Sequence, residues 1–177
     1  MIRTERLVLR PLEEVDADRL LEFWNLPEVT RWVLRPTRTS EELGESLRQA
    51  ARNPDDHSLA ILLDGVVIGS VSLELTDGYV QPGGPARTVA DLGYTLDPAY
   101  AGRGYATEAA RAAVDHALGQ LGVRRVTAGA FVDNVASVRV LEKLGMRREE
   151  HAVRDSWHAE RGWIDGCTYA LLADERH

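Results

Sequence analysis

The strongest constraint on the fold lies between Asp91 and Ala110, where a strand-like run enters a loop and then a helix without a break. The loop contains Gly102 and Gly104, and glycine lets a ligand approach the backbone closely because it has no Cβ atom. The first amide groups of a helix lack partners inside it, and the helix dipole favours an anion beside them. We therefore predict that this loop binds a pyrophosphate; a glycine turn that binds nothing is the alternative.

Length and composition indicate one soluble α/β domain over residues 1–177. The net charge of −7 argues against a broad basic surface for nucleic acid. The single cysteine, Cys167, cannot form an internal disulfide, and no cysteine pair has metal-binding spacing. The sequence shows no signal peptide and no run approaching the ~20 apolar residues of a membrane-spanning helix. We expect a cytoplasmic protein that binds no metal, nucleic acid or membrane.

The hydrophobic periodicity before the loop predicts strands and helices in alternation. We expect strands at 2–9, 57–63, 66–75 and 88–96 and helices at 13–24 and 39–52. Pro27 is expected to stop the first helix, and Thr39 or Ser40 to cap the second. The Asp64-Gly65 pair between two apolar runs predicts a tight hairpin.

After the loop we expect a helix at 104–121, a strand at 125–131, a second helix ending near Leu144, and strands at 146–153 and 164–173. Asp133 or Asn134 is the expected cap of the second helix. The 88–96 and 125–131 strands should be parallel neighbours, because a helix connects them. The whole pattern predicts a mixed α/β fold.

A second motif identifies the ligand of the loop. Residues 134–146 read Asn-Val-Ala-Ser-Val-Arg-Val-Leu-Glu-Lys-Leu-Gly-Met, about 30 residues after Gly-Tyr-Ala-Thr-Glu-Ala at 104–109. With Thr-Glu-Arg-Leu-Val-Leu-Arg-Pro at 4–11, this combination resembles the GCN5-related N-acetyltransferase (GNAT) superfamily, in its ribosomal-protein-alanine acetyltransferase (RimJ/RimL-like) branch. The resemblance implies a GNAT fold: a mixed, mostly antiparallel sheet with a splayed parallel strand pair, flanked by helices. It also implies acetyl-CoA as donor and an amine as acceptor.

The resemblance assigns a set of residues to acetyl-CoA. The loop backbone would hold the pyrophosphate, and the strand end would pair with the pantetheine arm; these residues are Leu96, Gly102, Arg103, Gly104, Tyr105 and Ala106. Asn134 is the expected side-chain contact to pantetheine, with a plain helix cap as the alternative. The sequence departs from the family at Ala101, where relatives have glutamine or arginine.

A second departure concerns the proton for the leaving thiolate. Many relatives have a tyrosine as general acid two residues before Lys143, and here that position is Leu141, which carries no proton to give. Ser137 follows Asn134 by three residues and therefore lies on the same helix face. We predict that Ser137 hydrogen-bonds the developing thiolate.

The general base should be a carboxylate near the centre of the sheet. Asp91 lies on an internal strand, where alternation places it with Gly93 and Thr95 and opposite to Tyr94. A carboxylate is seldom placed on an internal strand for packing. Glu74, at the end of the preceding strand, is the alternative base.

These residues predict an N-acetyltransferase acting on a primary amine, with a protein N-terminal α-amine favoured by the branch resemblance. A small-molecule acetyltransferase for an antibiotic or metabolite amine, a non-catalytic acetyl-CoA sensor, and an unrelated nucleotide-binding protein are the alternatives. In relatives, the segments that contain Trp24, Trp32, Val33 and Tyr79 lie on the acceptor side, with core packing as the alternative for each. We expect the charged stretch at 154–161 to be a loop near the acceptor. The apolar stretch at 169–173 would permit a homodimer through the last strands.

Overall fold

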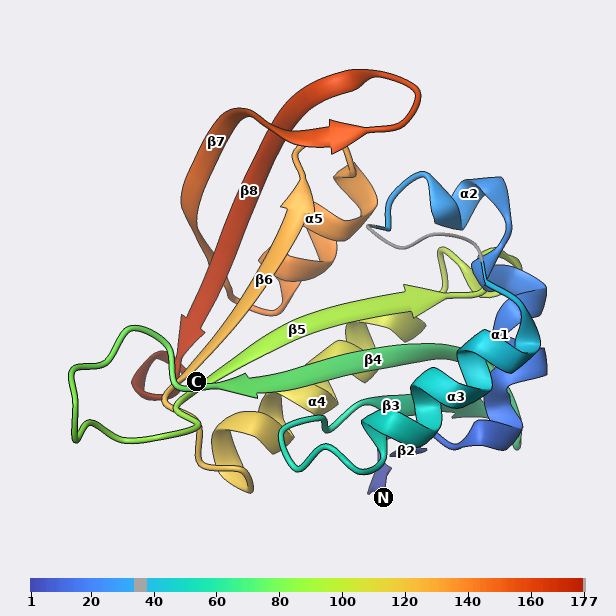
Figure 1. Ribbon diagram of the computed structural model, residues 1–177, viewed down its shortest axis with the longest axis horizontal. Coiled ribbons are helices and arrows are strands. Elements are labelled where there is room, and N and C mark those ends of the chain that lie inside the picture. The colour runs from blue at the N-terminus through green and yellow to red at the C-terminus, as the bar shows by residue number, and fades with distance from the viewer. Residues whose placement is uncertain (34–37, 177) are drawn as a thin grey trace.

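The computed structural model describes residues 1–33 and 38–176, whose strands form one sheet in the order β1-β2-β3-β4-β5-β6-β8-β7 (Figure 1). The strands are β1 Ile2–Arg3, β2 Val8–Pro11, β3 Leu59–Leu63, β4 Val66–Thr76, β5 Val89–Leu96, β6 Arg125–Phe131, β7 Arg147–His158 and β8 Gly162–Leu172. Every neighbouring pair is antiparallel except β5 and β6, which are parallel. This confirms the predicted mixed, mostly antiparallel sheet.

Helices cover both faces of the sheet (Figure 1). The α-helices are α1 Ala17–Trp24, α2 Pro27–Thr30, α3 Ser40–Ala50, α4 Tyr105–Gly119 and α5 Val135–Lys143, with short 3-10 turns at Glu14–Asp16, Pro98–Tyr100 and Ala173–Glu175. The larger hydrophobic cluster joins α4 and α5 to one face of the sheet, and a smaller cluster joins α1 and α3 to the other. No helix in the described residues is both long and apolar enough to cross a membrane.

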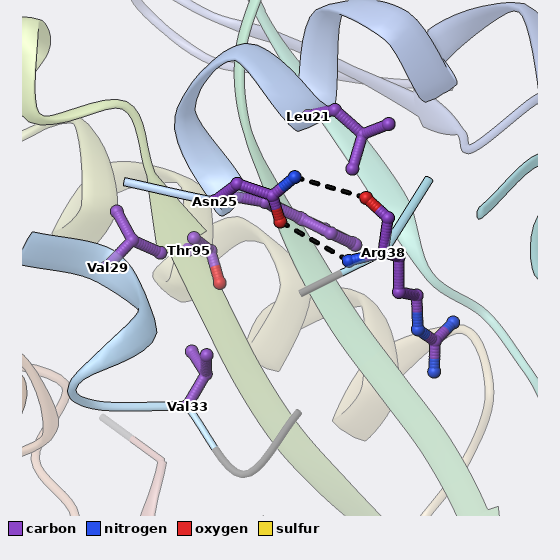
Figure 2. A pocket seen from close by; sticks show the side chains of 7 residues that line it. Leu21, Asn25, Val29, Val33, Arg38 and Thr95 are labelled. Atoms are coloured by element: carbon purple, nitrogen blue, oxygen red, sulfur yellow. Dashed lines mark hydrogen bonds between the residues drawn. The ribbon is translucent and has the colours of Figure 1, made fainter. Parts of the chain in front are cut away.

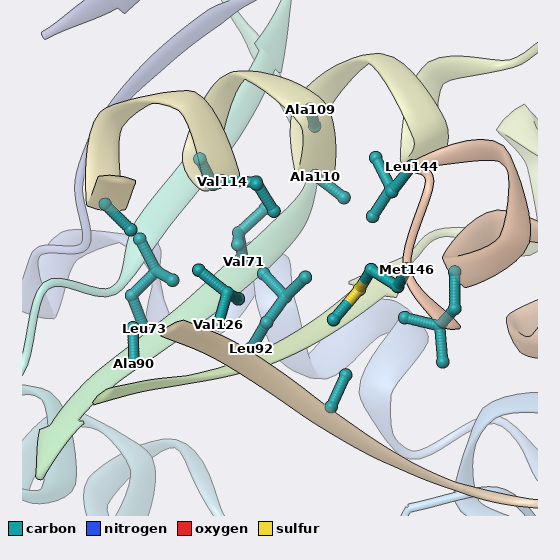
Figure 3. Packing of buried hydrophobic residues seen from close by; sticks show 14 of the residues in the cluster. Val71, Leu73, Ala90, Leu92, Ala109, Ala110, Val114, Val126, Leu144 and Met146 are labelled. Carbon is teal, nitrogen blue, oxygen red and sulfur yellow. The ribbon is translucent and has the colours of Figure 1, made fainter. Parts of the chain in front are cut away.

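The α4 face of the core depends on small residues. Ala109 and Ala110 of α4 are fully buried against the strands, and Val114 lies one turn further along the same helix face (Figure 3). Alanines let the helix axis approach the sheet, and the gap is filled from the strand side by residues such as Val71 and Leu92. This close packing fixes the start of α4, and with it the glycine loop, relative to β5.

The parallel pair is short. Val89, Ala90 and Asp91 of β5 pair with residues 125–127 of β6, and beyond Asp91 the two strands diverge (Figure 1). The sheet therefore consists of two arms, β1 to β5 and β6 to β7, that share only this short stretch of pairing. The splayed parallel pair implied by the family resemblance is present.

The N-terminal strand differs from its prediction. Residues 2–9 form two strands instead of one, because the chain turns at Thr4, whose backbone amide donates to the carbonyl of Leu7 at 3.0 Å. Pro11 is the last residue of β2 and pairs with Leu59. Proline is tolerated there because β1 is too short to need its missing amide.

The first helix ends at Trp24, before Pro27, as predicted, and Pro27 then begins α2, because proline suits the first position of a helix, where no intrahelical partner is needed. One further boundary differs. Residues 154–158, predicted as part of a loop, belong to β7, which pairs with β8 as far as His158 and Gly162. Charged residues fit a strand there because most of β7 is exposed at the sheet edge.

The local turn predictions are confirmed. Asp64 and Gly65 both have positive φ, 49° and 82°, as a two-residue hairpin requires. Thr39 caps α3 and exchanges hydrogen bonds with Glu42 in a capping box.

Within the stretch at 169–173, Tyr169, Ala170 and Leu171 are buried. They lie in β8 between β6 and β7, so they do not form an exposed edge for a second subunit.

Candidate active site

The glycine loop lies exposed at the start of α4. Gly102 and Gly104 have φ of 76° and 83°, the left-handed region in which side chains are strained, and Gly104 caps the helix. Within the described residues, the backbone amides of 102–107 donate no hydrogen bond. These unpaired donors, with Arg103 exposed beside them, fit a pyrophosphate.

The end of β5 offers a second set of unpaired backbone groups. On the β6 side the pairing ends at Asp91, which lies opposite Thr127. From Leu92 to Leu96 this edge of β5 has no partner strand among the described residues, while its other edge pairs with β4. An extended amide chain such as pantetheine could pair with this edge as an added strand.

Asn134 lies where its sequence motif predicts, at the start of α5. Its side-chain oxygen accepts a hydrogen bond from the amide of Ser137 at 3.2 Å, so Asn134 is the N-cap of the helix. The side-chain NH₂ makes no hydrogen bond to a described residue. The cap therefore leaves the donor end of Asn134 free for a ligand carbonyl.

Ser137 has a partner that the sequence did not indicate. The hydroxyl of Tyr94 on β5 lies 2.8 Å from Ser137 Oγ and also donates to the Ser137 carbonyl oxygen at 3.0 Å. Burial raises the pKa of Tyr94 to about 12, against a smaller lowering by the Ser137 hydrogen bond, so the phenol keeps its proton at neutral pH. Strand alternation could have placed Tyr94 on the α4 face, but nothing in the sequence pairs it with Ser137.

The two candidate bases lie side by side. Asp91 of β5 and Glu74 of β4 are direct partners across the antiparallel pair, and Thr127 Oγ1 donates to Asp91 Oδ1 at 3.2 Å. The pKa of Asp91 is raised, chiefly because neighbouring atoms desolvate the carboxylate, although the residue as a whole is exposed. The Thr127 hydrogen bond lowers that pKa less, and the negative charge of Glu74 raises it further.

The acid and base candidates approach the splay from opposite faces of the sheet. Tyr94 packs against the cluster around α4, whereas Thr95 faces α1 and lines a pocket there. By strand alternation Asp91 shares the face of Thr95. A group held in the splay would meet Ser137 from one face and a carboxylate from the other.

A small, largely apolar pocket lies beside Thr95 on the α1 face (Figure 2). Asn25 closes one side by bonding the backbone of Arg38 twice: its Nδ2 donates to the Arg38 carbonyl at 3.1 Å, and its Oδ1 accepts from the Arg38 amide at 3.4 Å. The remaining lining residues are Leu21, Trp24, Val29 and Val33. Trp24 and Val33, predicted on the acceptor side, are thus part of this pocket.

The other two aromatic residues predicted on the acceptor side, Trp32 and Tyr79, lie in different surroundings. Trp32 packs against Phe131 and the buried His158, with ring centroids 6.2 and 5.5 Å away, so it joins the α2 region to the second arm of the sheet. Tyr79 is fully exposed in the loop that precedes β5, at the opposite end of the strand from the pocket. Within residues 1–33 and 38–176, no cluster of His, Cys, Asp and Glu could hold a metal ion.

The segment that contains the glycine loop, the splay and the α5 cap matches a known protein family. A model of the acetyltransferase (GNAT) domain matches residues 6–147. The chain belongs to the GNAT acetyltransferase family. It is therefore an N-acetyltransferase, an enzyme of a family that uses acetyl-CoA.

Individual GNAT relatives resemble the chain over most of its length. The probable N-acetyltransferase YjcK of Bacillus subtilis strain 168 is 30% identical over 185 residues, covering 97% of each chain. The L-amino acid N-acetyltransferase AaaT of Escherichia coli strain K12 is 27% identical over 144 residues, covering 81% of this chain and 84% of AaaT. Among solved structures, the ribosomal L7/L12 α-N-protein acetyltransferase RimL in complex with coenzyme A shares the fold, with a TM-score of 0.83, 20% identity and 97% coverage of both chains.

Proposed function

We propose that this GNAT enzyme transfers the acetyl group of acetyl-CoA to a primary α-amine next to a small apolar side chain. The observation that carries the proposal is the splay of β5 from β6, bordered by the unpaired amides of the glycine loop and by the Asn134–Ser137 cap. Together these three features offer hydrogen-bonding groups of the kinds that a phosphorylated pantetheine needs.

The residues predicted from the sequence have distinct tasks in this proposal. The backbone of 102–106, with Arg103, binds the pyrophosphate. The free edge of β5 as far as Leu96 pairs with the pantetheine amides, and the Asn134 side-chain NH₂ donates to a pantetheine carbonyl. Acetyl-CoA supplies the acetyl group, and its thiol is the leaving group.

The proton transfers are divided between the two faces of the sheet. As the amine nitrogen bonds to the carbonyl carbon and the C–S bond breaks, one proton leaves the nitrogen and sulfur gains negative charge. Asp91 or Glu74 takes the proton from the amine, directly or through a water. The raised pKa of Asp91 makes it a stronger base than an ordinary aspartate. Ser137, hydrogen-bonded to Tyr94, stabilises the sulfur.

The pocket beside Thr95 favours the acceptor class. Its apolar wall from Leu21, Val29 and Val33 suits an aliphatic side chain. None of the described residues that line the pocket has a carboxylate for a second ammonium group. A peptide N-terminus carries such a side chain on the carbon next to its amine. The name of AaaT, an L-amino acid N-acetyltransferase, supports the alternative that the α-amine belongs to a free amino acid.

A panel of acceptors tests the proposal through release of coenzyme A thiol. Peptides beginning with alanine or valine should react, whereas the same peptides with a blocked N-terminus and a free lysine should not. Free amino acids, a polyamine and an aminoglycoside complete the panel. Preference for the polyamine or the aminoglycoside would contradict the proposed acceptor, and reaction of free amino acids alone would select the alternative.

A further inference from the structure

The N-terminal motif at 4–11 contacts the glycine loop and the first turn of α4, which lie about 100 residues further along the chain. Thr4 Oγ1 donates to Glu108 Oε1 at 2.6 Å, and the backbone amide of Arg6 donates to the same oxygen at 2.9 Å. The guanidinium of Arg6 donates from Nε to Glu108 Oε2 at 2.7 Å. Both carboxylate oxygens of Glu108 are thus bound by one short N-terminal turn.

Arg6 also contacts the loop itself. Its Nη1 donates to the carbonyl oxygen of Arg103 at 3.0 Å, and its guanidinium lies 4.6 Å from the centroid of the Tyr105 ring. A Cβ atom on Gly104 would lie 3.4 Å from Arg6 Nη2. Arg6 therefore touches residues 103, 104 and 105 in succession, on the segment whose amides are unpaired.

The position of Glu108 poses an electrostatic problem that these contacts solve. A carboxylate in the first turn of α4 benefits from the helix dipole, but it repels any anion bound at the same helix end. Partial burial alone would raise the pKa of Glu108, yet hydrogen bonds from Thr4 and Arg6 outweigh it and lower the pKa. The ionised carboxylate is consequently held, with its charge paired, by the N-terminal turn.

We infer that Arg6, fixed by Glu108 and Thr4, is a positioning residue that holds the Arg103–Tyr105 backbone in the conformation that receives the pyrophosphate. This inference rests on the proposed function in one respect, the assignment of the loop to the pyrophosphate. It gives the N-terminal motif a role in donor binding that involves neither the acceptor nor the proton transfers.

The experiment measures the dissociation constants of coenzyme A and of pantetheine, which lacks the pyrophosphate, by calorimetry. Arg6→Met should weaken coenzyme A binding by about 10-fold or more, the scale expected for losing charge-assisted hydrogen bonds. Its pantetheine affinity should stay within about 2-fold of wild type. Arg3→Met is the matched control, because Arg3 is an exposed cation of the same segment without a contact to Glu108, and it should bind coenzyme A as wild type does.

A double variant separates positioning from simple charge pairing. Arg6→Met leaves the Glu108 carboxylate free to repel phosphate, and adding Glu108→Gln removes that charge. If Arg6 positions the loop, the double variant remains weak for coenzyme A. Recovery of wild-type affinity in the double variant, or equal weakening of coenzyme A and pantetheine by Arg6→Met, would overturn the inference.

Gly104→Val shows whether the loop assignment itself holds, since it strains a residue with φ of 83°. Wild-type coenzyme A affinity in Gly104→Val would remove the pyrophosphate from this loop and the inference with it. Weakened binding in Gly104→Val together with unchanged binding in Arg6→Met would leave the loop assignment intact and overturn only the role of Arg6.

Discussion

The hydrogen bond between Tyr94 and Ser137 restricts the orientation of the Ser137 hydroxyl, the group that we propose stabilises the leaving sulfur. A lone serine hydroxyl rotates freely, whereas Ser137 Oγ lies 2.8 Å from a phenol that remains protonated at neutral pH. The phenol has one proton, which it gives either to the Ser137 carbonyl oxygen or to Oγ. In the second arrangement the serine proton is left to point toward the splay. Leu141, at the family's tyrosine position, is buried in the core and takes no part.

Tyr94→Phe should lower kcat by up to ~10-fold, the scale of one hydrogen bond, with little change in KM for acetyl-CoA. The discriminating measurement is a double-mutant cycle with Ser137→Ala. That variant removes Oγ but keeps the Ser137 carbonyl that Tyr94 also bonds. If Tyr94 acts through Oγ, Tyr94→Phe has no further effect in the Ser137→Ala background; an equal loss in both backgrounds would mean that Tyr94 only braces α5.

Asp91→Asn should lower kcat by roughly 10²-fold or more while raising the melting temperature at pH 7. The folded-state pKa of Asp91 is raised, so its contribution to stability is present below the unfolded pKa and is lost as pH rises through the folded value. An uncharged asparagine avoids that loss. The difference in melting temperature should shrink as the pH approaches 4, and a lower melting temperature at pH 7 would contradict the sign.

Glu74→Gln is the comparison that assigns the base. Glu74 faces Asp91 directly, so its removal should lower the pKa of Asp91 by removing a nearby negative charge. If Asp91 is the base, Glu74→Gln retains activity and moves the acidic limb of the pH–rate profile to lower pH. A loss of activity comparable to Asp91→Asn would transfer the role to Glu74.

At the scale of the element, the start of α5 combines a structural and a ligand-binding task in Asn134. Asn134→Asp should keep the melting temperature, since aspartate caps a helix as well as asparagine and suits the helix dipole. It should raise KM for acetyl-CoA, because it cannot donate to a carbonyl. Asn134→Ala should lose both, with about 1 kcal/mol of stability; an unchanged KM in Asn134→Asp would leave Asn134 as a cap alone.

The elements with strong local signals were predictable from the sequence. The Asp64-Gly65 hairpin and the Thr39 cap depend on a few adjacent residues, and both are present. The single strand predicted at 2–9 was wrong because the chain turns at Thr4, where both the backbone amide and the hydroxyl of Thr4 bond Leu7. The strand character of 154–158 depends on pairing with β8, which no local pattern reveals.

At the scale of the whole molecule, the sheet is two arms joined by three backbone pairs between β5 and β6. A donor bound in the splay would contact both arms, and like any ligand that binds only the folded chain it should raise the free energy of unfolding. Coenzyme A at ~100 times its dissociation constant adds about 2.7 kcal/mol, or roughly 5–10 °C for a chain of this size. Thermal denaturation with and without coenzyme A measures this, and ATP at the same concentration should produce no comparable shift.

The composition of the site was predictable in part because its motifs are local, whereas its assembly was not. The glycine loop and the Asn134–Ser137 cap each lie within a few residues, so spacing alone identifies them. Tyr94 is 43 residues from Ser137, and the pocket draws on α1, α2 and β5. Such contacts follow from how the sheet and helices pack, which a single sequence does not encode in any periodic pattern.

The contact between Thr4 and Glu108 also affects the order in which the chain can fold during synthesis. The two residues are 104 positions apart, so at 5–20 residues per second a ribosome makes Glu108 roughly 5–20 s after Thr4. During that interval the N-terminal turn exists without the helix that completes it. Closing this long loop is entropically costly and should follow formation of the local β3–β4 hairpin. The glycine loop of the nascent chain should therefore gain its contact with the N-terminal turn only late in synthesis.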